Sequence, residues 1–489
     1  MSKEPLLKNI VRYFSSSLYR TIFGVINSFI KPKLLTPELL GLWSLLSLIP
    51  AYSEYSHLGT RTSMRYLIPY HEGKGEPQKN DEIKGTVYYG TLYAVFIIAC
   101  ILVLFSFKEG FDLKIRLGLI TVALMVILEW YFCYYITLFK SYQRFKILAS
   151  TLYLKTTVTF LLSVVLIYFF NIYGLYLSAI ISLLIVNTYL KVKYPFERPY
   201  PFQFRAYKEL VKKGFPLLVF MFGALFISTS DRFIISYFLG NEQLGYYTIA
   251  IMISSIFLSV PGSAREVIEP RLMENVSKSS KEDNLKEYFF KPLINIAYFL
   301  PFLAGPVIFV LPVVIRLVLP RYTDGIIPAQ IIIMGGYFLA ISDMTRGIII
   351  ANNLQIKASI IMSFSLPINI VLSIYFIKLG MGLRGVAIGT SISYFISFIS
   401  LLVFVRIKCN YALKDWRSVI SGISWPFPVM CITILLLLKM SGMLPLNEDL
   451  TALANLFIYS LIMFFTYLLA SRRYGLLKSF RPGKLLKYI

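Results

Sequence analysis

Charged side chains lie inside several long apolar stretches of this chain, and they are the first candidates for chemistry. A charge at the centre of a membrane-spanning helix costs roughly 2.5 to 3.5 kcal/mol, so it must face protein or water. Binding and ion movement concentrate at such positions. The candidates are Arg20, Glu129, Lys155, Asp231, Arg232, Asp343 and Arg346.

Polar residues of the first apolar stretch share one face of a helix. Ser16, Arg20 and Asn27 are separated by four and seven residues, a spacing that the helical period of 3.6 residues brings into line. We therefore expect Asn27 to join Arg20 in lining a cavity. Asp231 and Arg232 are neighbours and point about 100° apart, so each needs a partner of its own.

Glu129 is the candidate for ion coupling. It stands alone in the apolar run VALMVILEWYFCYY, where an isolated carboxyl group can take up and release a proton. A permanently neutral, hydrogen-bonded glutamic acid fits the same pattern, and both interpretations stay open.

Lys155, Asp343 and Arg346 are secondary candidates, because each also has a structural explanation. Asp343 and Arg346 are three residues apart and can neutralise each other on one helix. Lys155 is expected near the cytoplasmic end of its helix, where its long side chain can reach the lipid headgroups.

The stretches that carry these residues are long enough to cross a bilayer core of about 30 Å as helices. The 489 residues are 57% hydrophobic and 15% charged, with a mean hydropathy of +0.68, which leaves no room for a soluble domain of ordinary size. The fold class is therefore all-α integral membrane, with about fourteen transmembrane helices. The spans are expected at 10–30, 38–58, 85–107, 115–139, 148–170, 174–190, 215–239, 244–264, 292–318, 326–351, 358–378, 385–405, 420–440 and 451–471.

The net charge of +24 arises mainly in the loops. Assigning alternate loops to opposite sides puts about 35 Lys and Arg on the side of the N-terminus and about 10 on the other side. This bias places both termini of a multi-pass protein of the cytoplasmic (inner) membrane in the cytoplasm. Anionic lipid headgroups explain the basic loops, so we expect membrane lipids as partners and no nucleic acid.

Cysteines and histidines indicate no metal site, and no motif indicates a cofactor. Cys100, Cys133, Cys409 and Cys431 lack the paired spacing of a zinc site or a disulfide framework. The histidines at 57 and 71 lie too far apart for a local metal motif.

An internal repeat divides the chain. LLTPELLGLW at 34–43 and FLGNEQLGYY at 238–247 share their Leu, Glu and Gly positions at an offset of about 204 residues, although chance recurrence at membrane loops is the alternative. A second, weaker match at a similar offset supports the duplication. We expect six-helix bundles at 1–213 and 214–418, followed at 419–489 by two further helices and a basic cytoplasmic tail.

The run DRFIISYFLGNEQLGYYTIA at 231–250 resembles the seventh helix and following turn of polysaccharide transporters, a family that includes O-antigen flippases. LLTPELLGLW, SYQRFK and LGMGLRGVAIGTSIS are similar to the matching places in that family, and the resemblance covers nearly the whole chain. It implies two six-helix bundles facing across a central cavity, as in the superfamily that also contains multidrug exporters and lipid II flippases.

The activity that this resemblance implies is the transfer of an undecaprenyl-diphosphate-linked oligosaccharide, a repeat unit of O-antigen, capsule or exopolysaccharide, by alternating access. A buried diphosphate needs cationic partners, and a planar guanidinium holds two phosphate oxygens at once. We therefore expect Arg20, Asn27, Asp231 and Arg232 to form the substrate-binding cavity. Enzymes of polysaccharide assembly are a further candidate class of partner.

Two other functions fit parts of the pattern. A cation-coupled multidrug exporter of the same superfamily would need a cavity dominated by carboxylates, whereas the candidates here include two arginines. A membrane-embedded glycosyltransferase or polysaccharide polymerase would need a large aqueous loop with paired carboxylates or metal ligands, and the longest loops have only about 25 residues. We therefore expect a transporter and not an enzyme.

Overall fold

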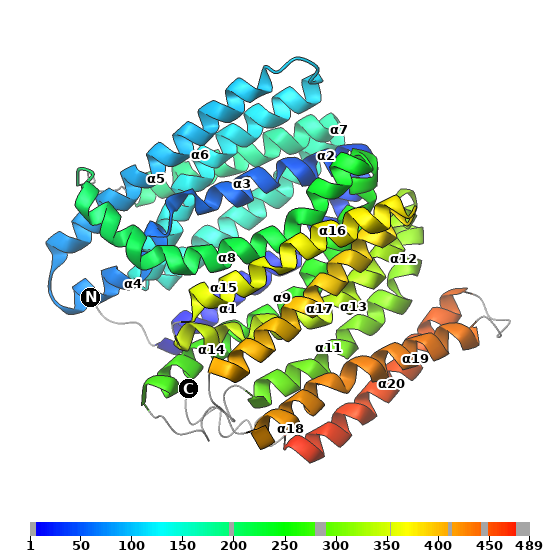
Figure 1. The fold of residues 1–489 in the computed structure, drawn as a ribbon. Helices are drawn as coiled ribbons and strands as arrows, with labels where there is room; N and C mark the ends of the chain where they lie inside the picture. Colours follow the sequence, from blue (N-terminus) through cyan, green and yellow to red (C-terminus); the bar gives the residue numbers. More distant parts are fainter. Residues whose placement is uncertain are drawn as a thin grey trace. The chain divides into compact units, whose positions relative to one another are not determined.

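The computed structural model of the chain describes residues 6–194, 200–278, 290–352, 354–408, 413–441 and 448–475. In these residues the regular structure is helical, without strands (Figure 1). The chain forms two compact units, Met1–Leu225 and Phe226–Ile489. The division at 213 and 418 that the repeat indicates remains a prediction.

The first unit consists of long helices joined by short connections. Its elements are α1 (Leu6–Leu34), α2 (Pro37–Leu46), α3 (Leu48–Ser53), η1 (Glu54–His57), α4 (Thr60–Gly73), α5 (Pro77–Ser106), α6 (Leu113–Ser141), α7 (Phe145–Lys193) and most of α8 (Phe204–Phe238). Helix α1 packs along α7, and α6 packs against both α5 and α7. A buried hydrophobic cluster that includes Met64, Val87, Tyr134 and Leu148 joins α4, α5, α6 and α7, so the walls of the site described below belong to one packed body.

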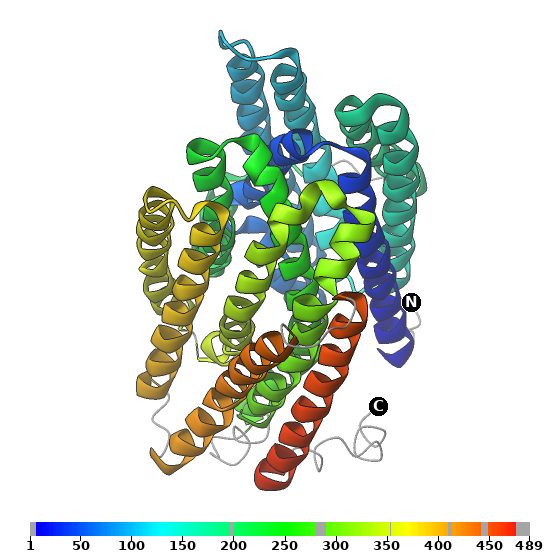
Figure 2. The ribbon, with the colours of Figure 1, turned by 90° about the vertical axis from the view of Figure 1, so that its right-hand side faces the viewer.

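The second unit contains the end of α8 and the helices that follow. These are α9 (Asn241–Lys278), α11 (Lys291–Phe309), α12 (Leu311–Val318), η3 (Pro320–Gly325), α13 (Ile326–Met344), α14 (Arg346–Ala351), α15 (Gln355–Ser363), α16 (Ser365–Lys378), α17 (Gly382–Lys408), α18 (Leu413–Ser424), α19 (Pro426–Ser441) and α20 (Glu448–Tyr474). Helix α13 packs on α9 and α17, and α16 packs on α17. The last two helices, α19 and α20, lie side by side, and α20 also contacts α11 (Figure 2).

The multi-pass membrane fold is confirmed, whereas the count of about fourteen spans is not. Ten helices of the described residues are long and apolar enough to cross a membrane, or eleven if the bent α8 forms one span. Each predicted range lies mostly on helical residues, so the difference lies largely in how the helices are divided. Two predicted spans meet inside α7 at the non-helical Asn171 (φ 51°, ψ −127°), and the second predicted span is shared among α2, α3 and η1.

The ninth predicted span contains Pro301, Pro306 and Pro312, which are expected to kink or interrupt it because proline lacks the N–H that a helix interior requires. The structure interrupts it once: α11 ends at Phe309, and α12 begins with Pro312 in its first turn. Pro301 and Pro306 lie inside α11, which stays helical through both.

A tight turn after η1 brings the start of α4 against α8 within the first unit. Leu58 (φ 47°) and Gly59 (φ 90°) are both left-handed, a conformation that favours glycine. Gly59 touches Gly214 of α8 so closely that a Cβ atom on Gly214 would lie 2.0 Å from the Gly59 oxygen. One turn on, the Ser63 hydroxyl donates a hydrogen bond of 2.6 Å to the carbonyl of Leu210. These contacts fix the first turn of α4 against α8.

Candidate functional site

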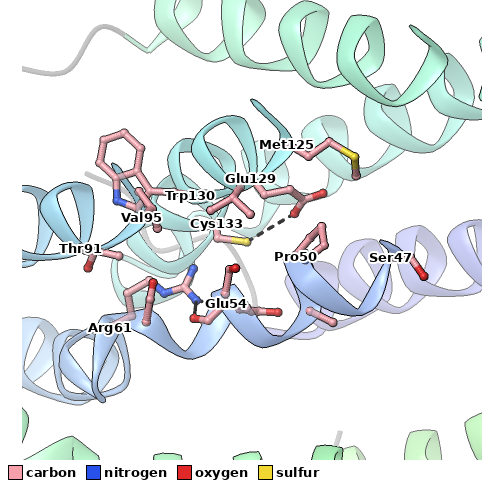
Figure 3. A pocket seen from close by; sticks show the side chains of 14 residues that line it. Ser47, Pro50, Glu54, Arg61, Thr91, Val95, Met125, Glu129, Trp130 and Cys133 are labelled. Atoms are coloured by element: carbon pink, nitrogen blue, oxygen red, sulfur yellow. Dashed lines mark hydrogen bonds and ion pairs between the residues drawn. The ribbon is translucent and has the colours of Figure 1, made fainter. Parts of the chain in front are cut away.

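A pocket inside the first unit gathers charged and polar side chains from η1, α4, α5 and α6. Its volume is about 280 Å³, and Figure 3 shows it from close by. We call it the N-terminal pocket. It is lined by Ser47, Pro50, Ala51, Ser53, Glu54, Ser56, Arg61, Thr91, Val95, Met125, Val126, Glu129, Trp130 and Cys133.

Arg61 and Glu54 form an ion pair in one wall of the N-terminal pocket. The Nη2 atom of Arg61 lies 3.5 Å from Oε1 of Glu54 and donates a hydrogen bond of 2.7 Å to the Glu54 backbone carbonyl. The Arg61 side chain is 8% exposed, whereas that of Glu54 is 59% exposed. The guanidinium is therefore buried with its charge balanced, while the carboxylate stays accessible.

Glu129 is not isolated, so the reasoning that placed it alone in an apolar helix was wrong. The Nζ atom of Lys155 on α7 lies 3.1 Å from its Oε1 atom and 3.9 Å from the ring centre of Phe132. Lys155 thus has a partner inside the unit, which the sequence-based reasoning did not foresee. The role of Glu129 in ion coupling stays a prediction, and its starting state is an ion pair.

Cys133 lies between the two ion pairs. Its thiol donates a long hydrogen bond of 3.9 Å to Oε2 of Glu129, and the charges of Arg61, Glu54, Glu129 and Lys155 all act on it. Figure 3 shows Glu129, Cys133 and Glu54 around one space. Two carboxylates and the Arg61 guanidinium line this space, and Lys155 balances the Glu129 charge from outside the lining. In the described part of the chain, no three His, Cys, Asp or Glu residues gather to hold a metal ion.

Sequence reasoning missed Glu54 and Arg61. Glu54 lies in the last turn of the second predicted span and Arg61 in the loop expected after it, and charged residues are ordinary at such places. The available signal was Gly59, because a glycine after an apolar stretch favours a turn that can return the next residues to the protein interior.

The polar face predicted for α1 splits in two. The amide oxygen of Asn27 accepts a hydrogen bond of 3.1 Å from the hydroxyl of Ser163 on α7, and Ser16 is fully buried. Arg20, in contrast, is exposed. The structure therefore brings Asn27 against α7 and leaves Arg20 on the surface of the unit.

Asp231 and Arg232 occupy different surroundings within the second unit. Asp231 is 3% exposed, and its Oδ1 atom accepts a hydrogen bond of 2.9 Å from the backbone N–H of Arg232. The Arg232 side chain is half-buried. Tyr247 and Tyr394, which are also buried, lie near the Asp231 carboxylate.

A buried hydrogen-bond network begins one residue before Asp231. The Ser230 hydroxyl donates to the amide oxygen of Asn369 at 3.1 Å, and the amide nitrogen of Asn369 donates to the hydroxyl of Thr390 at 3.2 Å. None of these three residues is more than 4% exposed. The network joins α8, α16 and α17 and holds the turn of α8 that carries Asp231.

Asp343 and Arg346 lie on either side of a helix break. Helix α13 ends at Met344 and α14 begins at Arg346. Their spacing suggested that the two residues share one helix, but the break at Thr345 separates them.

Comparison with known proteins identifies relatives for most of the chain. Residues 76–323 match the family model described as Polysaccharide biosynthesis protein. An uncharacterised membrane protein of Methanocaldococcus jannaschii is 25% identical over 386 residues, which are 71% of this chain and 74% of that protein.

Two solved structures have folds similar to that of this chain. The lipid II flippase MurJ in an inward closed conformation has a TM-score of 0.68 at 16% identity, over 94% of this chain and 98% of that one. An inward-facing multidrug resistance transporter of the MATE family has a TM-score of 0.64 at 15% identity, over 82% of this chain and 98% of that one. At such identities the similarity concerns the fold alone.

Proposed function

Because the chain belongs to the polysaccharide biosynthesis protein family, we propose that it moves a lipid-linked oligosaccharide across the cytoplasmic membrane. The substrate is an undecaprenyl-diphosphate-linked repeat unit of O-antigen, capsule or exopolysaccharide, which passes from the inner to the outer leaflet by alternating access. The fold shared with a lipid II flippase supports this proposal. Membrane lipids and enzymes of polysaccharide assembly are the proposed partners, and both termini lie in the cytoplasm.

The observation that carries the choice of substrate is the half-buried Arg232 in α8, which is apolar enough to cross a membrane as a bent pair of helices. Arg20 is exposed on α1, which is not among the helices of the described residues that are apolar enough to cross a membrane. An arginine inside a membrane span is costly, and its planar fork suits the two oxygens of a phosphate. We propose that Arg20 in the first unit and Arg232 in the second unit each bind the diphosphate during transport, with Asn27 and Asp231 as the further substrate-binding residues of their own units.

Leaflet exchange in proteoliposomes tests this proposal. The purified protein is reconstituted with a fluorescent undecaprenyl-diphosphate oligosaccharide, and the outer-leaflet fraction is followed by dithionite quenching. Losing a charged hydrogen bond of about 1.5 to 3 kcal/mol should slow exchange by roughly tenfold to a hundredfold in Arg20→Ala and Arg232→Ala. Arg205→Ala is the matched control, because Arg205 also lies on α8 but has a side chain that is 95% exposed.

Near-normal exchange in either Arg20→Ala or Arg232→Ala, with the variant still present in the membrane, would refute the assignment of the diphosphate. A slow Arg205→Ala variant would mean that any loss of positive charge reduces exchange, so the two assigned arginines would have no special role.

Ion coupling through Glu129 completes the proposed mechanism. A proton that binds to Glu129 cancels its attraction for Lys155, so protonation would release one wall of the N-terminal pocket from α7. Lys155, Asp343 and Arg346 remain secondary candidates for functional residues. Exchange that is independent of a pH gradient, together with full activity of Glu129→Gln, would remove the coupling proposal.

Multidrug export is the second candidate function, because the fold is shared with a multidrug resistance transporter. The same proteoliposomes distinguish the two. Efflux of amphipathic cationic dyes without exchange of the lipid-linked oligosaccharide would move the assignment to multidrug export.

A further inference from the structure

The N-terminal pocket has the size of a site for one small ring. Pockets that bind drug-sized ligands measure about 300 to 1,000 Å³, and this one measures about 280 Å³. It is lined only by residues of the first unit, so its shape depends on helices that pack together. It can hold one sugar ring, and the other rings of an oligosaccharide would lie outside it.

The charges around the N-terminal pocket disfavour an ionic ligand. Arg61 is paired with Glu54 at 3.5 Å, and Lys155 is paired with Glu129 at 3.1 Å. An added anion or cation would have to compete with a partner that is already in place, at the cost of leaving a charge in a poorly solvated site. A neutral ligand leaves both pairs intact.

Three polar groups in the pocket wall have no hydrogen-bond partner within the described residues. These are the hydroxyl of Ser56, the hydroxyl of Thr91 and the indole N–H of Trp130. Thr91 is 3% exposed and Trp130 is 7% exposed, so bulk water does not readily reach them. Buried polar groups in native proteins are nearly always paired with protein, ordered water or a ligand, and all three of these can donate a hydrogen bond.

We propose that the N-terminal pocket binds one neutral sugar ring, a hexose or an N-acetylhexosamine. This inference rests on the proposed function, since the ring would be one residue of the lipid-linked oligosaccharide. Sugar hydroxyls both accept and donate hydrogen bonds, so they match the unused donors of Thr91 and Trp130 and the accessible carboxylate of Glu54. Apolar side chains such as Pro50 and Val95 line the rest of the pocket and suit the C–H faces of a pyranose.

Cys133 provides a direct test, because its thiol lines the pocket. The other cysteines, Cys100, Cys409 and Cys431, are replaced by serine, and Cys133 is labelled with a small membrane-permeant maleimide. Glucose, galactose or N-acetylglucosamine should slow the labelling, by about tenfold when the sugar is present at ten times its dissociation constant. Glucuronate and glucosamine, which carry a charge, should protect Cys133 less at equal concentration.

Two variants remove single donors while keeping the shape of the pocket. Thr91→Val and Trp130→Phe should each raise the sugar concentration needed for half protection by about tenfold. Thr86→Val is the matched control for threonine, because Thr86 lies on the same helix, is also buried without a hydrogen-bond partner in the described residues, and does not line the pocket. Trp425→Phe, at an exposed tryptophan, is the control for tryptophan.

Equilibrium dialysis with tritiated N-acetylglucosamine measures binding directly and does not depend on the reactivity of the thiol. Saturable binding that weakens in Thr91→Val and Trp130→Phe, but not in Thr86→Val, is the expected result. No binding by dialysis would mean that the pocket holds only water, and the proposal would fail. Equal protection of Cys133 by neutral and charged sugars would also overturn it. So would a loss of sugar binding in Thr86→Val as large as that in Thr91→Val.

Failure of the sugar pocket and failure of the proposed function give different results. Protection of Cys133 by sugars without leaflet exchange would support the sugar pocket and refute the transport of lipid-linked oligosaccharide. Normal leaflet exchange without sugar binding would support the transport and refute the sugar pocket.

Discussion

The ion pair between Glu129 and Lys155 allows a quantitative prediction. At 3.1 Å and an effective dielectric constant of about 20, the gross attraction of the two charges is about 5 kcal/mol. The side chains are 33% and 25% exposed, so desolvation and screening remove most of this energy. Exposed pairs contribute up to about 1 kcal/mol, and breaking a fully buried pair costs about 3 to 5 kcal/mol. We expect a coupling free energy of about 1 to 2 kcal/mol for this half-buried pair.

A double-mutant cycle with Glu129→Gln, Lys155→Met and the double variant measures this coupling. Lys155 also lies 3.9 Å from the ring centre of Phe132, a cation–π contact of about 0.5 to 2 kcal/mol. Lys155→Met should therefore lower the free energy of unfolding more than Glu129→Gln does, and the double variant should be more stable than the sum of the two changes predicts. The free energy of unfolding is measured by titration in mixed detergent micelles.

The pair of Lys79 and Glu76 is the control for distance. Its nitrogen and oxygen also lie 3.1 Å apart, but the side chains are 57% and 34% exposed and the residues are three apart in sequence. The same cycle at this pair should show little coupling, because water screens it. Additive effects at Glu129 and Lys155, or equal coupling at the two pairs, would refute the argument from burial.

The double variant also separates stability from transport. If Glu129 only holds α6 to α7, the double variant should recover leaflet exchange and the part of the stability that a single change loses by leaving one charge unpaired, but not the part lost with the contact between Lys155 and Phe132. If Glu129 couples transport to protons, the double variant should recover the same part of the stability, while its exchange no longer depends on a pH gradient. These outcomes are read from the same purified protein in micelles and in proteoliposomes.

Two further predictions concern packing. Gly214→Ala should lower the free energy of unfolding by about 1 to 3 kcal/mol, because its Cβ atom would lie 2.0 Å from the Gly59 oxygen. Gly223→Ala on the same helix is the control, because its Cβ atom would meet nothing within 4 Å. An equal drop in the free energy of unfolding in the two variants would contradict the steric explanation. Asn369→Leu should lower the free energy of unfolding by about 1 to 3 kcal/mol, since it leaves the buried Thr390 hydroxyl without its amide partner; an unchanged unfolding curve in mixed micelles would show that the network does not stabilise the second unit.

Local sequence patterns predicted the features that depend on local physics. Long apolar stretches gave the helical membrane class, because every backbone polar group in lipid must be paired within a helix or a closed barrel. The proline-rich ninth span indicated the break between α11 and α12, which comes directly before Pro312, although α11 continues through Pro301 and Pro306. Neither inference needed any knowledge of which helices touch.

Contacts between residues of different helices could not be predicted from these patterns. Glu129 appeared isolated because its partner, Lys155, lies 26 residues away on another helix, and no periodicity within one helix reveals a contact of this kind. Arg61 was assigned to a loop because charges mark the ends of spans, yet the left-handed turn at Leu58 and Gly59 returns it to the interior. The N-terminal pocket depends on both contacts, so the sequence indicated some of its residues but not the site.

Asp231 and Arg232 show that one sequence signature can contain two roles. The adjacent side chains were expected to diverge by about 100°, and the structure gives a carboxylate that is 3% exposed beside an arginine that is half-buried. The Asp231 carboxylate accepts a hydrogen bond from the backbone of Arg232, next to a network that fixes the same turn of α8. In the proposed substrate site, the role of Asp231 is to hold the turn that presents Arg232, and the proposal assigns the contact with the anionic substrate to Arg232. On this proposal, a change at Asp231 acts on transport through the position of its neighbour.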